Sequence, residues 1–101
     1  MHNAVNLHSK DLNDQQIILL VFSKGAKTRR QILKTLLRSP KNCHQIAKEL
    51  KLDWWTVQKH LKKLKEANLI KQIKLGRITF YKSTYEGEKL IENLDSYNGG
   101  K

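Results

Sequence analysis

The 101-residue sequence predicts a mainly α-helical fold with one small β-hairpin, an α+β architecture in the order α-α-α-α-β-β-α. Apolar residues recur at helical spacing through the first part of the chain, and one later stretch alternates apolar and polar residues around a glycine. The length leaves room for one domain with a modest core, so a homodimer is expected.

The first two expected helices differ in how many of their faces are apolar. Over residues 14–23, the run Ile17–Phe22 is apolar around most of a helix, which must therefore be covered from several sides. Residues 27–38 form a second, amphipathic helix, and Pro40 ends it because the residue before a proline avoids helical geometry. Its apolar face is expected to hold Ile32, Leu33, Leu36 and Leu37.

A tight turn is expected to join the third and fourth helices. Asn42 and Gln45 form a capping-box pattern at the start of the third helix. Asp53 caps the fourth helix, residues 54–67, and Asn68 can take the left-handed conformation that ends it. The buried stripe of the fourth helix is expected at Val57, Leu61 and Leu64.

The last third of the domain is expected to be a hairpin followed by a helix. Residues 70–82 alternate like two strands, and Gly76 can supply the positive φ that a two-residue turn needs. Ser83, with Glu86 three residues later, is expected to cap a final helix that runs to about residue 96. That helix brings together Leu90, Ile91 and Leu94.

The charge of the chain lies in its middle. Twenty basic and nine acidic residues give a net charge of +11, and residues 41–82 alone hold eleven of the basic and three of the acidic residues. Such a surface binds a polyanion. The run Ile17–Phe22 is far shorter than the roughly 20 residues of a membrane-spanning helix, so nucleic acid is the expected partner rather than a membrane.

The sequence also predicts the cellular location of the protein and the limits of its domain. No secretion signal opens the chain, and the single cysteine, Cys43, suits a reducing compartment, so a cytoplasmic protein is expected. We expect one domain over residues 11–96, with flexible ends at residues 1–10 and 97–101. The first and last helices of that domain are expected to form the dimer seam.

Two helices joined by a tight turn and followed at once by a basic hairpin make a winged helix-turn-helix. The sequence resembles the ArsR-type regulators in Thr28–Leu33, Ile46–Leu50, Thr56–Leu64 and the Gly76-Arg77 turn. Thr84–Gly87 is similar to the start of the last helix in MarR- and PadR-like regulators. The resemblance covers roughly residues 19–94 and implies a DNA-binding transcriptional regulator. The Lys- and Ile-rich composition would suit a thermophilic archaeon or its virus.

The resemblance also has departures. The metal-sensing branch of the ArsR type carries a cysteine pair on its helix-turn-helix, whereas this chain has only Cys43 beside His44, so no metal and no other cofactor is expected. Trp54 and Trp55 stand where relatives have a small polar pair. Nothing in the sequence indicates a small-molecule effector.

The contact residues follow from helical spacing. With the buried stripe inward, Trp54, Trp55, Gln58, Lys59 and Lys62 lie outward on the helix that would enter the major groove. Gln58 suits adenine, Lys59 suits guanine, and an indole can lie against a thymine methyl. Phosphate contacts are expected from three lysines of the same helix, Lys62, Lys63 and Lys65. Further candidates for phosphate contact are Arg29, Arg30, Lys41 and Lys48. Lys74 and Arg77 are expected near a minor groove.

Other interpretations of these residues stay open. One of Trp54 and Trp55 could cover the domain's own apolar surface, and His60 is expected to be a half-buried scaffold residue. An enzyme is not expected, because the basic region lacks a phosphate loop, a nucleophile elbow and paired carboxylates. The alternative function is a winged-helix module that docks a protein or binds single strands through Trp54 and Trp55.

Overall fold

The computed structural model describes the backbone of residues 14–97 and the side chains of residues 14–95. The expected flexible ends, residues 1–10 and 97–101, therefore lie outside the described part, apart from Tyr97, which is the last residue of a helix. The elements in chain order are α2 (Asp14–Ile17), the π-helix η1 (Ile18–Phe22), α3 (Ala26–Arg38), β1 (Lys41–Asn42), α4 (Cys43–Leu50), α5 (Trp54–Glu66), β2 (Ile70–Leu75), β3 (Ile78–Ser83) and α6 (Tyr85–Tyr97).

The mainly helical winged helix-turn-helix is confirmed, with two additions. The first helix ends in a π-helical turn, closed by a hydrogen bond of 2.9 Å from the Ser23 amide to the Ile18 carbonyl. The sheet has a third strand, since β1 pairs with β3 and gives the antiparallel order β1-β3-β2 within the described residues. β1 was not predicted because two residues are too few to show an alternating pattern.

The turns follow the predicted backbone chemistry. Gly76, at the tip of the hairpin, has a φ of 64°, and Asn68, after α5, also has a φ of 64°. Both values lie in the left-handed region that glycine and asparagine tolerate best. The hairpin register, with Leu75 opposite Ile78, leaves Gly76 and Arg77 as the two turn residues.

The cap of the last helix lies one residue later than predicted. Ser83 is not the cap, because it is the last residue of β3, where it pairs with Ile70. Thr84 takes this role, since its hydroxyl accepts a hydrogen bond of 3.0 Å from the Gly87 amide. A side chain at Gly87 would place its Cβ 2.3 Å from the Leu69 carbonyl oxygen, so this position needs glycine.

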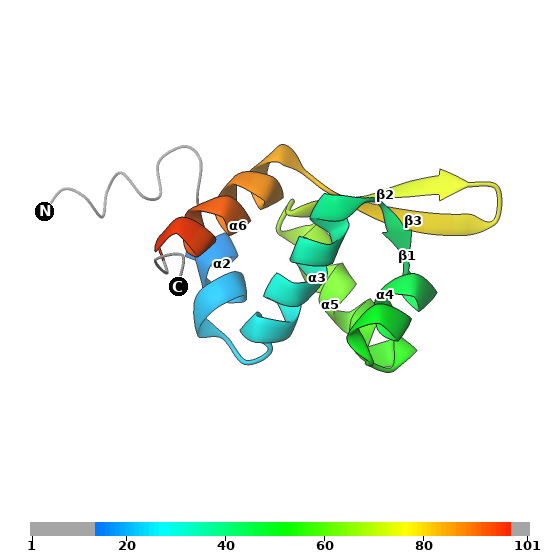
Figure 1. The fold of residues 1–101 in the computed structure, drawn as a ribbon, viewed down its shortest axis with the longest axis horizontal. Helices are drawn as coiled ribbons and strands as arrows, with labels where there is room; N and C mark the ends of the chain where they lie inside the picture. Colours follow the sequence, from blue (N-terminus) through cyan, green and yellow to red (C-terminus); the bar gives the residue numbers. More distant parts are fainter. Residues whose placement is uncertain (1–13, 98–101) are drawn as a thin grey trace, which may run out of the picture.

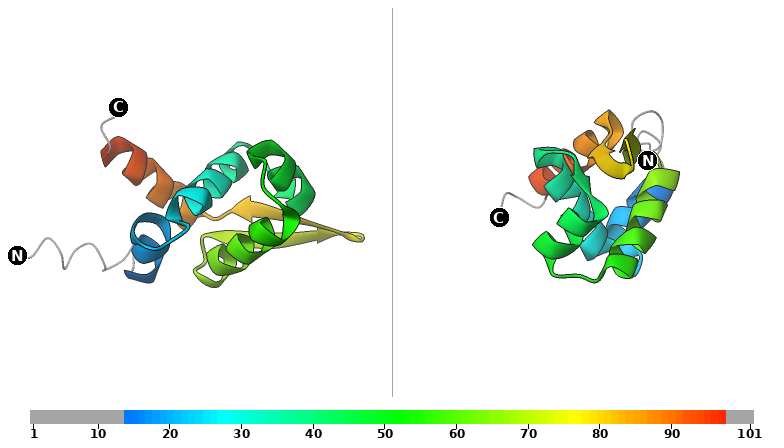
Figure 2. Two further views of the ribbon diagram at one scale, coloured as in Figure 1. Left: turned by 90° about the horizontal axis from the view of Figure 1, so that it is seen from below. Right: turned by 90° about the vertical axis from the view of Figure 1, so that its right-hand side faces the viewer.

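The core surrounds α3, which runs through the middle of the molecule (Figure 1). The fully buried leucines and isoleucines of the core come from every helix except the short α2, from the start of β2 and from Leu69, which precedes β2. α2 and α6 lie at one end of the molecule, and the β2–β3 hairpin projects from the other (Figures 1 and 2). α5 packs one face against the core and exposes the other face to solvent. Within residues 14–97, no helix is both long and apolar enough to cross a membrane.

Candidate nucleic-acid interface

The helix-turn-helix consists of α4, a short turn and α5, and side-chain caps fix the start of both helices. The predicted capping box is present, with reciprocal 2.8 Å hydrogen bonds between Asn42 and Gln45. At the start of α5 the Asp53 carboxylate accepts from the amide and the hydroxyl of Thr56, each at 2.8 Å. These bonds hold the pKa of Asp53 below its ordinary value, so the cap stays ionised and stabilises the N-terminus of α5.

α5 divides into a buried and an exposed face, as its spacing predicted. Val57, Leu61 and Leu64 are fully buried or nearly so. His60, expected to be half-buried, is 8% exposed and belongs to the inner face. The outer face carries four exposed lysines, at positions 59, 62, 63 and 65, and only one acidic residue, Glu66. This face is therefore strongly positive.

The two tryptophans at the start of α5 have different environments. Trp54 is half-buried and packs against the hydrophobic core, with the His44 ring centroid 6.3 Å away. Trp55 is 76% exposed and meets Trp54 edge to face, with ring centroids 4.8 Å apart. Trp54 thus serves as the support on which Trp55 projects into solvent. Of the two, only Trp55 presents most of its indole to a ligand.

An open groove of about 570 Å³ lies between α5 and the hairpin of residues 70–82, which we call the wing. One hydrogen bond crosses it, of 2.7 Å, from the Lys65 ammonium to the Gln72 side chain on β2. The residues that line it are Trp55, Thr56, Gln58, Lys59, Leu61, Lys62, Lys65, Gln72 and Tyr81. The groove brings together five of the residues predicted to contact DNA.

The remaining predicted residues lie apart from this groove. Trp54 and Arg77 line a second hollow, of about 440 Å³, between the start of the helix-turn-helix and the wing. Lys63 and Lys74 are exposed and line neither hollow.

Gln72 and Tyr81 complete the groove and were not among the residues predicted to contact DNA. They are direct partners in the β2–β3 register, so their side chains lie on the same face of the wing, toward α5. The alternation of the two strands was the signal that could have identified them.

Gln58 interacts with two buried groups, the Cys43 thiol and the Tyr81 hydroxyl. Burial raises the pKa of the Cys43 thiol and of the Tyr81 hydroxyl, and a hydrogen bond from the Gln58 side chain partly offsets each rise. Gln58 also lines both hollows. Gln58 therefore shares the second hollow with Cys43 on α4 and Tyr81 on β3.

Among the further candidates for phosphate contact, Arg29 was predicted wrongly. Its side chain is 2% exposed, because it fills the space between η1 and α5 and hydrogen-bonds there. Arg30 donates to the Leu20 carbonyl at 2.6 Å, so its guanidinium is also engaged within the fold. Lys48 is exposed on α4.

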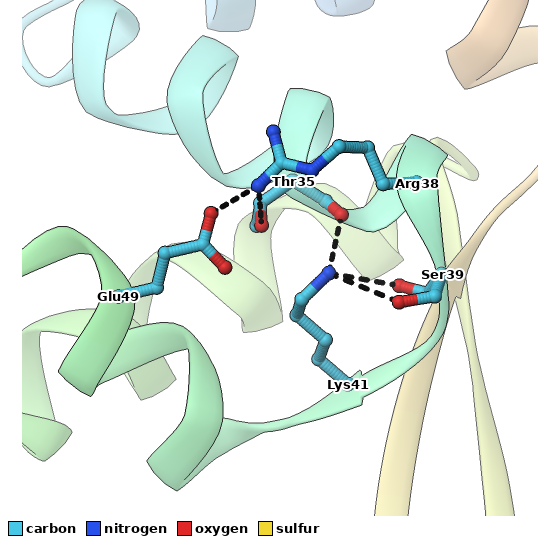
Figure 3. Close-up of polar contacts among 5 residues, drawn as sticks. All are labelled: Thr35, Arg38, Ser39, Lys41 and Glu49. Carbon is cyan, nitrogen blue, oxygen red and sulfur yellow. Dashed lines mark hydrogen bonds and ion pairs between the residues drawn. The ribbon is translucent and has the colours of Figure 1, made fainter.

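Lys41 belongs to a polar cluster between α3 and α4, formed by Thr35, Arg38, Ser39, Lys41 and Glu49 (Figure 3). Its ammonium donates to the Thr35 carbonyl at 2.8 Å and to the Ser39 hydroxyl at 3.1 Å. Beside it Arg38 forms an ion pair with Glu49. Hydrogen bonding to Thr35 and the charges of Arg38 and Lys41 lower the pKa of Glu49. This polar cluster links α4 to α3 through the Arg38–Glu49 ion pair.

Cys43 and His44 lack the surroundings of a metal site. The Cys43 thiol is buried and donates to the Trp54 carbonyl at 3.7 Å, while His44 is exposed. Within residues 14–95, no three His, Cys, Asp or Glu side chains come together in a way that could hold a metal ion.

Comparison with known proteins identifies the family to which this arrangement is similar. The family model described as "Bacterial regulatory protein, arsR family" matches residues 26–72, which include α4 and α5. Among curated proteins, no comparable match is found.

Solved structures with the same fold include reduced HlyU from Vibrio cholerae, with 30% identity, a TM-score of 0.60, and coverage of 68% of this chain and 75% of HlyU. An apo mutant of ZitR from Lactococcus lactis has 27% identity and a TM-score of 0.66, with 71% of this chain and 57% of ZitR covered. The regulator BldR from Sulfolobus solfataricus shares the fold at 16% identity and a TM-score of 0.69, with 78% of this chain and 58% of BldR covered. The chain thus spans little more than half the length of ZitR and BldR.

Proposed function

The chain belongs to the arsR family of bacterial regulatory proteins, which are DNA-binding transcriptional regulators, and from this premise we propose that it binds one double-stranded DNA sequence selectively. The observation that carries the proposal is the outer face of α5, where exposed lysines and an exposed indole border the groove beside the wing. α5 enters the major groove as the recognition helix, and the wing approaches the adjacent minor groove.

The side chains of the recognition helix have separate roles in this proposal. Gln58 and Lys59 read base edges, adenine and guanine respectively, and Trp55 lies against a thymine methyl. Three further lysines of α5 neutralise phosphates: Lys62, Lys63 and Lys65. Lys74 and Arg77 contact the backbone or enter the minor groove. Trp54 supports this surface from below, in keeping with its packing on the core.

The protein acts as a homodimer in this proposal, through the end of the molecule opposite the wing. Ile18, Val21 and Phe22 expose 50%, 36% and 76% of their surface, and Tyr85 on α6 exposes 72%. Large apolar side chains that are left exposed mark an interaction surface. A symmetric pair reads two half-sites, and we place the dimer in the cytoplasm, as a regulator without enzymatic activity.

Selection from a random duplex pool tests the proposal. A dimer of recognition helices selects a palindrome whose half-sites lie about one helical turn apart, roughly 10 base pairs from centre to centre. Single-base substitutions in each half-site then weaken binding by about 1–3 kcal/mol each. Recovery of unrelated sequences after repeated rounds, or equal binding of a single strand in a separate titration, would support the docking or single-strand module instead.

A further inference from the structure

Arg29 lies at the junction of α5, the recognition helix, and the N-terminal helical segment, which consists of α2 and η1. Its Nε donates to the Leu19 carbonyl at 2.9 Å, and its Nη2 donates to the Ser23 hydroxyl at 2.6 Å and the Lys24 carbonyl at 2.9 Å. Its Nη1 lies 3.1 Å from the Nδ1 atom of His60 on α5. One side chain of α3 therefore bonds to η1, to the turn after it and to the recognition helix.

Arg29 and His60 are buried together beneath the turn at Gly25. Arg29 and His60 expose 2% and 8% of their surface. A Cβ at Gly25 would lie 2.9 Å from the His60 ring and 3.0 Å from the Arg29 guanidinium, so the turn packs directly on both. None of the ion pairs among the described residues includes Arg29, so its guanidinium is stabilised by hydrogen bonds to neutral acceptors. Each of these acceptors therefore matters for a buried cation.

The contact defines the protonation state of His60. A guanidinium only donates hydrogen bonds, so Nδ1 must accept and the ring must be neutral, with its proton on Nε2. The charged groups that act on the ring are all cations, Arg29 from α3 and Lys59 and Lys63 from α5. The ammonium of Lys24, in the turn, points to solvent, and only its carbonyl faces the pair.

We propose that Arg29 is a positioning residue for base reading, which holds the recognition helix in register with the N-terminal helical segment through its hydrogen bond to His60. The inference rests on the proposed function, since it assigns how α5 is aimed at the bases. His60 lies one residue from Lys59 and two from Gln58, so a shift of α5 at His60 moves both base-reading side chains. The exposed Ile18, Val21 and Phe22 belong to the segment whose carbonyl Arg29 binds, so a partner on that surface is coupled to α5.

The test compares Arg29→Lys with Arg30→Lys. Both arginines donate to carbonyls of η1, but the bonds from Arg30 end there, whereas Arg29 also reaches His60. The measured quantity is the ratio of affinities for the selected duplex and for a random duplex. We expect Arg29→Lys to lower this ratio at least about tenfold, with random-duplex affinity within about twofold, because phosphate contacts tolerate a small shift of α5. Arg30→Lys leaves the ratio unchanged.

Two His60 variants and one spectrum keep the test decisive if Arg29→Lys does not fold. His60→Gln retains an acceptor and is expected to preserve the ratio, whereas His60→Leu removes the acceptor and lowers the ratio as Arg29→Lys does. In the unmodified protein, nitrogen NMR is expected to show His60 neutral at pH 7 with its proton on Nε2. A proton on Nδ1, or a folded Arg29→Lys or His60→Leu protein with an unchanged ratio, overturns the proposal. A wild-type ratio near one instead refutes the proposed function itself.

Discussion

Replacing Trp55 by alanine tests whether the exposed indole is a binding residue. A buried tryptophan removes about 150–250 Å² of surface from water. Trp55 is 76% exposed in the free protein, so roughly three quarters of that area is available to DNA. At about 25 cal/mol per Å², complete burial in a complex is worth at most about 3–5 kcal/mol.

The measurable loss of affinity is smaller than this limit. Ordering of the side chain and incomplete contact reduce it to about 2 kcal/mol, which is about a 30-fold weaker complex. The fold is little affected, because Trp55 loses only its edge contact with Trp54, and unfolding is expected to change by less than about 1 kcal/mol. Fluorescence anisotropy on the selected duplex and urea unfolding measure the two quantities.

The matched comparison is Trp54→Ala, which is expected to lose stability where Trp55→Ala does not. Trp54 packs against the core, so its removal leaves a cavity and costs about 2 kcal/mol or more of stability. The reasoning is refuted if Trp55→Ala binds the selected duplex as tightly as the unmodified protein, or if the Trp55 variant is the less stable of the two.

Three further predictions concern packing, salt and pH. Gly87→Ala places a methyl group 2.3 Å from the Leu69 carbonyl and is expected to lower stability by about 2 kcal/mol in thermal unfolding, whereas a more stable variant would contradict the packing of α6. Lys62→Gln is expected to reduce the slope of log affinity against log salt by about 0.9. The control is Lys34→Gln, because Lys34 lies on α3 and pairs with Asp95, so this variant should leave the slope unchanged. Equal slopes in all three proteins would refute the phosphate contact of Lys62. Burial and neighbouring cations lower the pKa of His60, so the unfolded chain takes up the proton more readily and stability falls as pH drops below about 6.5. Urea unfolding between pH 5 and 8 should show this loss, and His60→Gln should remove its share of it.

Features that depend on neighbours in the sequence were predictable. Asn42 and Gln45, or Asp53 and the first turn of α5, interact across three residues, so the pattern of letters contains the whole interaction. Gly76 and Asn68 were predictable for the same reason, because a left-handed residue is a local requirement. The buried stripe of α5 followed from helical spacing alone.

Features that depend on distant neighbours were not predictable. Arg29 looked like a surface cation on an amphipathic helix, and its burial depends on His60, which lies 31 positions later. Trp54 and Trp55 are adjacent and chemically identical, so only the packed core decides which one is covered. The hydroxyl of Thr84, rather than Ser83, caps α6 because β3 extends through Ser83 to pair with Ile70.

The most direct test of the central claim is one competition titration at physiological salt. It compares the affinity for the selected duplex with the affinities for a random duplex and a single strand of the same length. A recognition helix that reads bases predicts a preference of about 10³-fold or more for the selected duplex. Equal affinity for all three nucleic acids would contradict it, because the lysines of α5 would then be neutralising phosphates without reading bases.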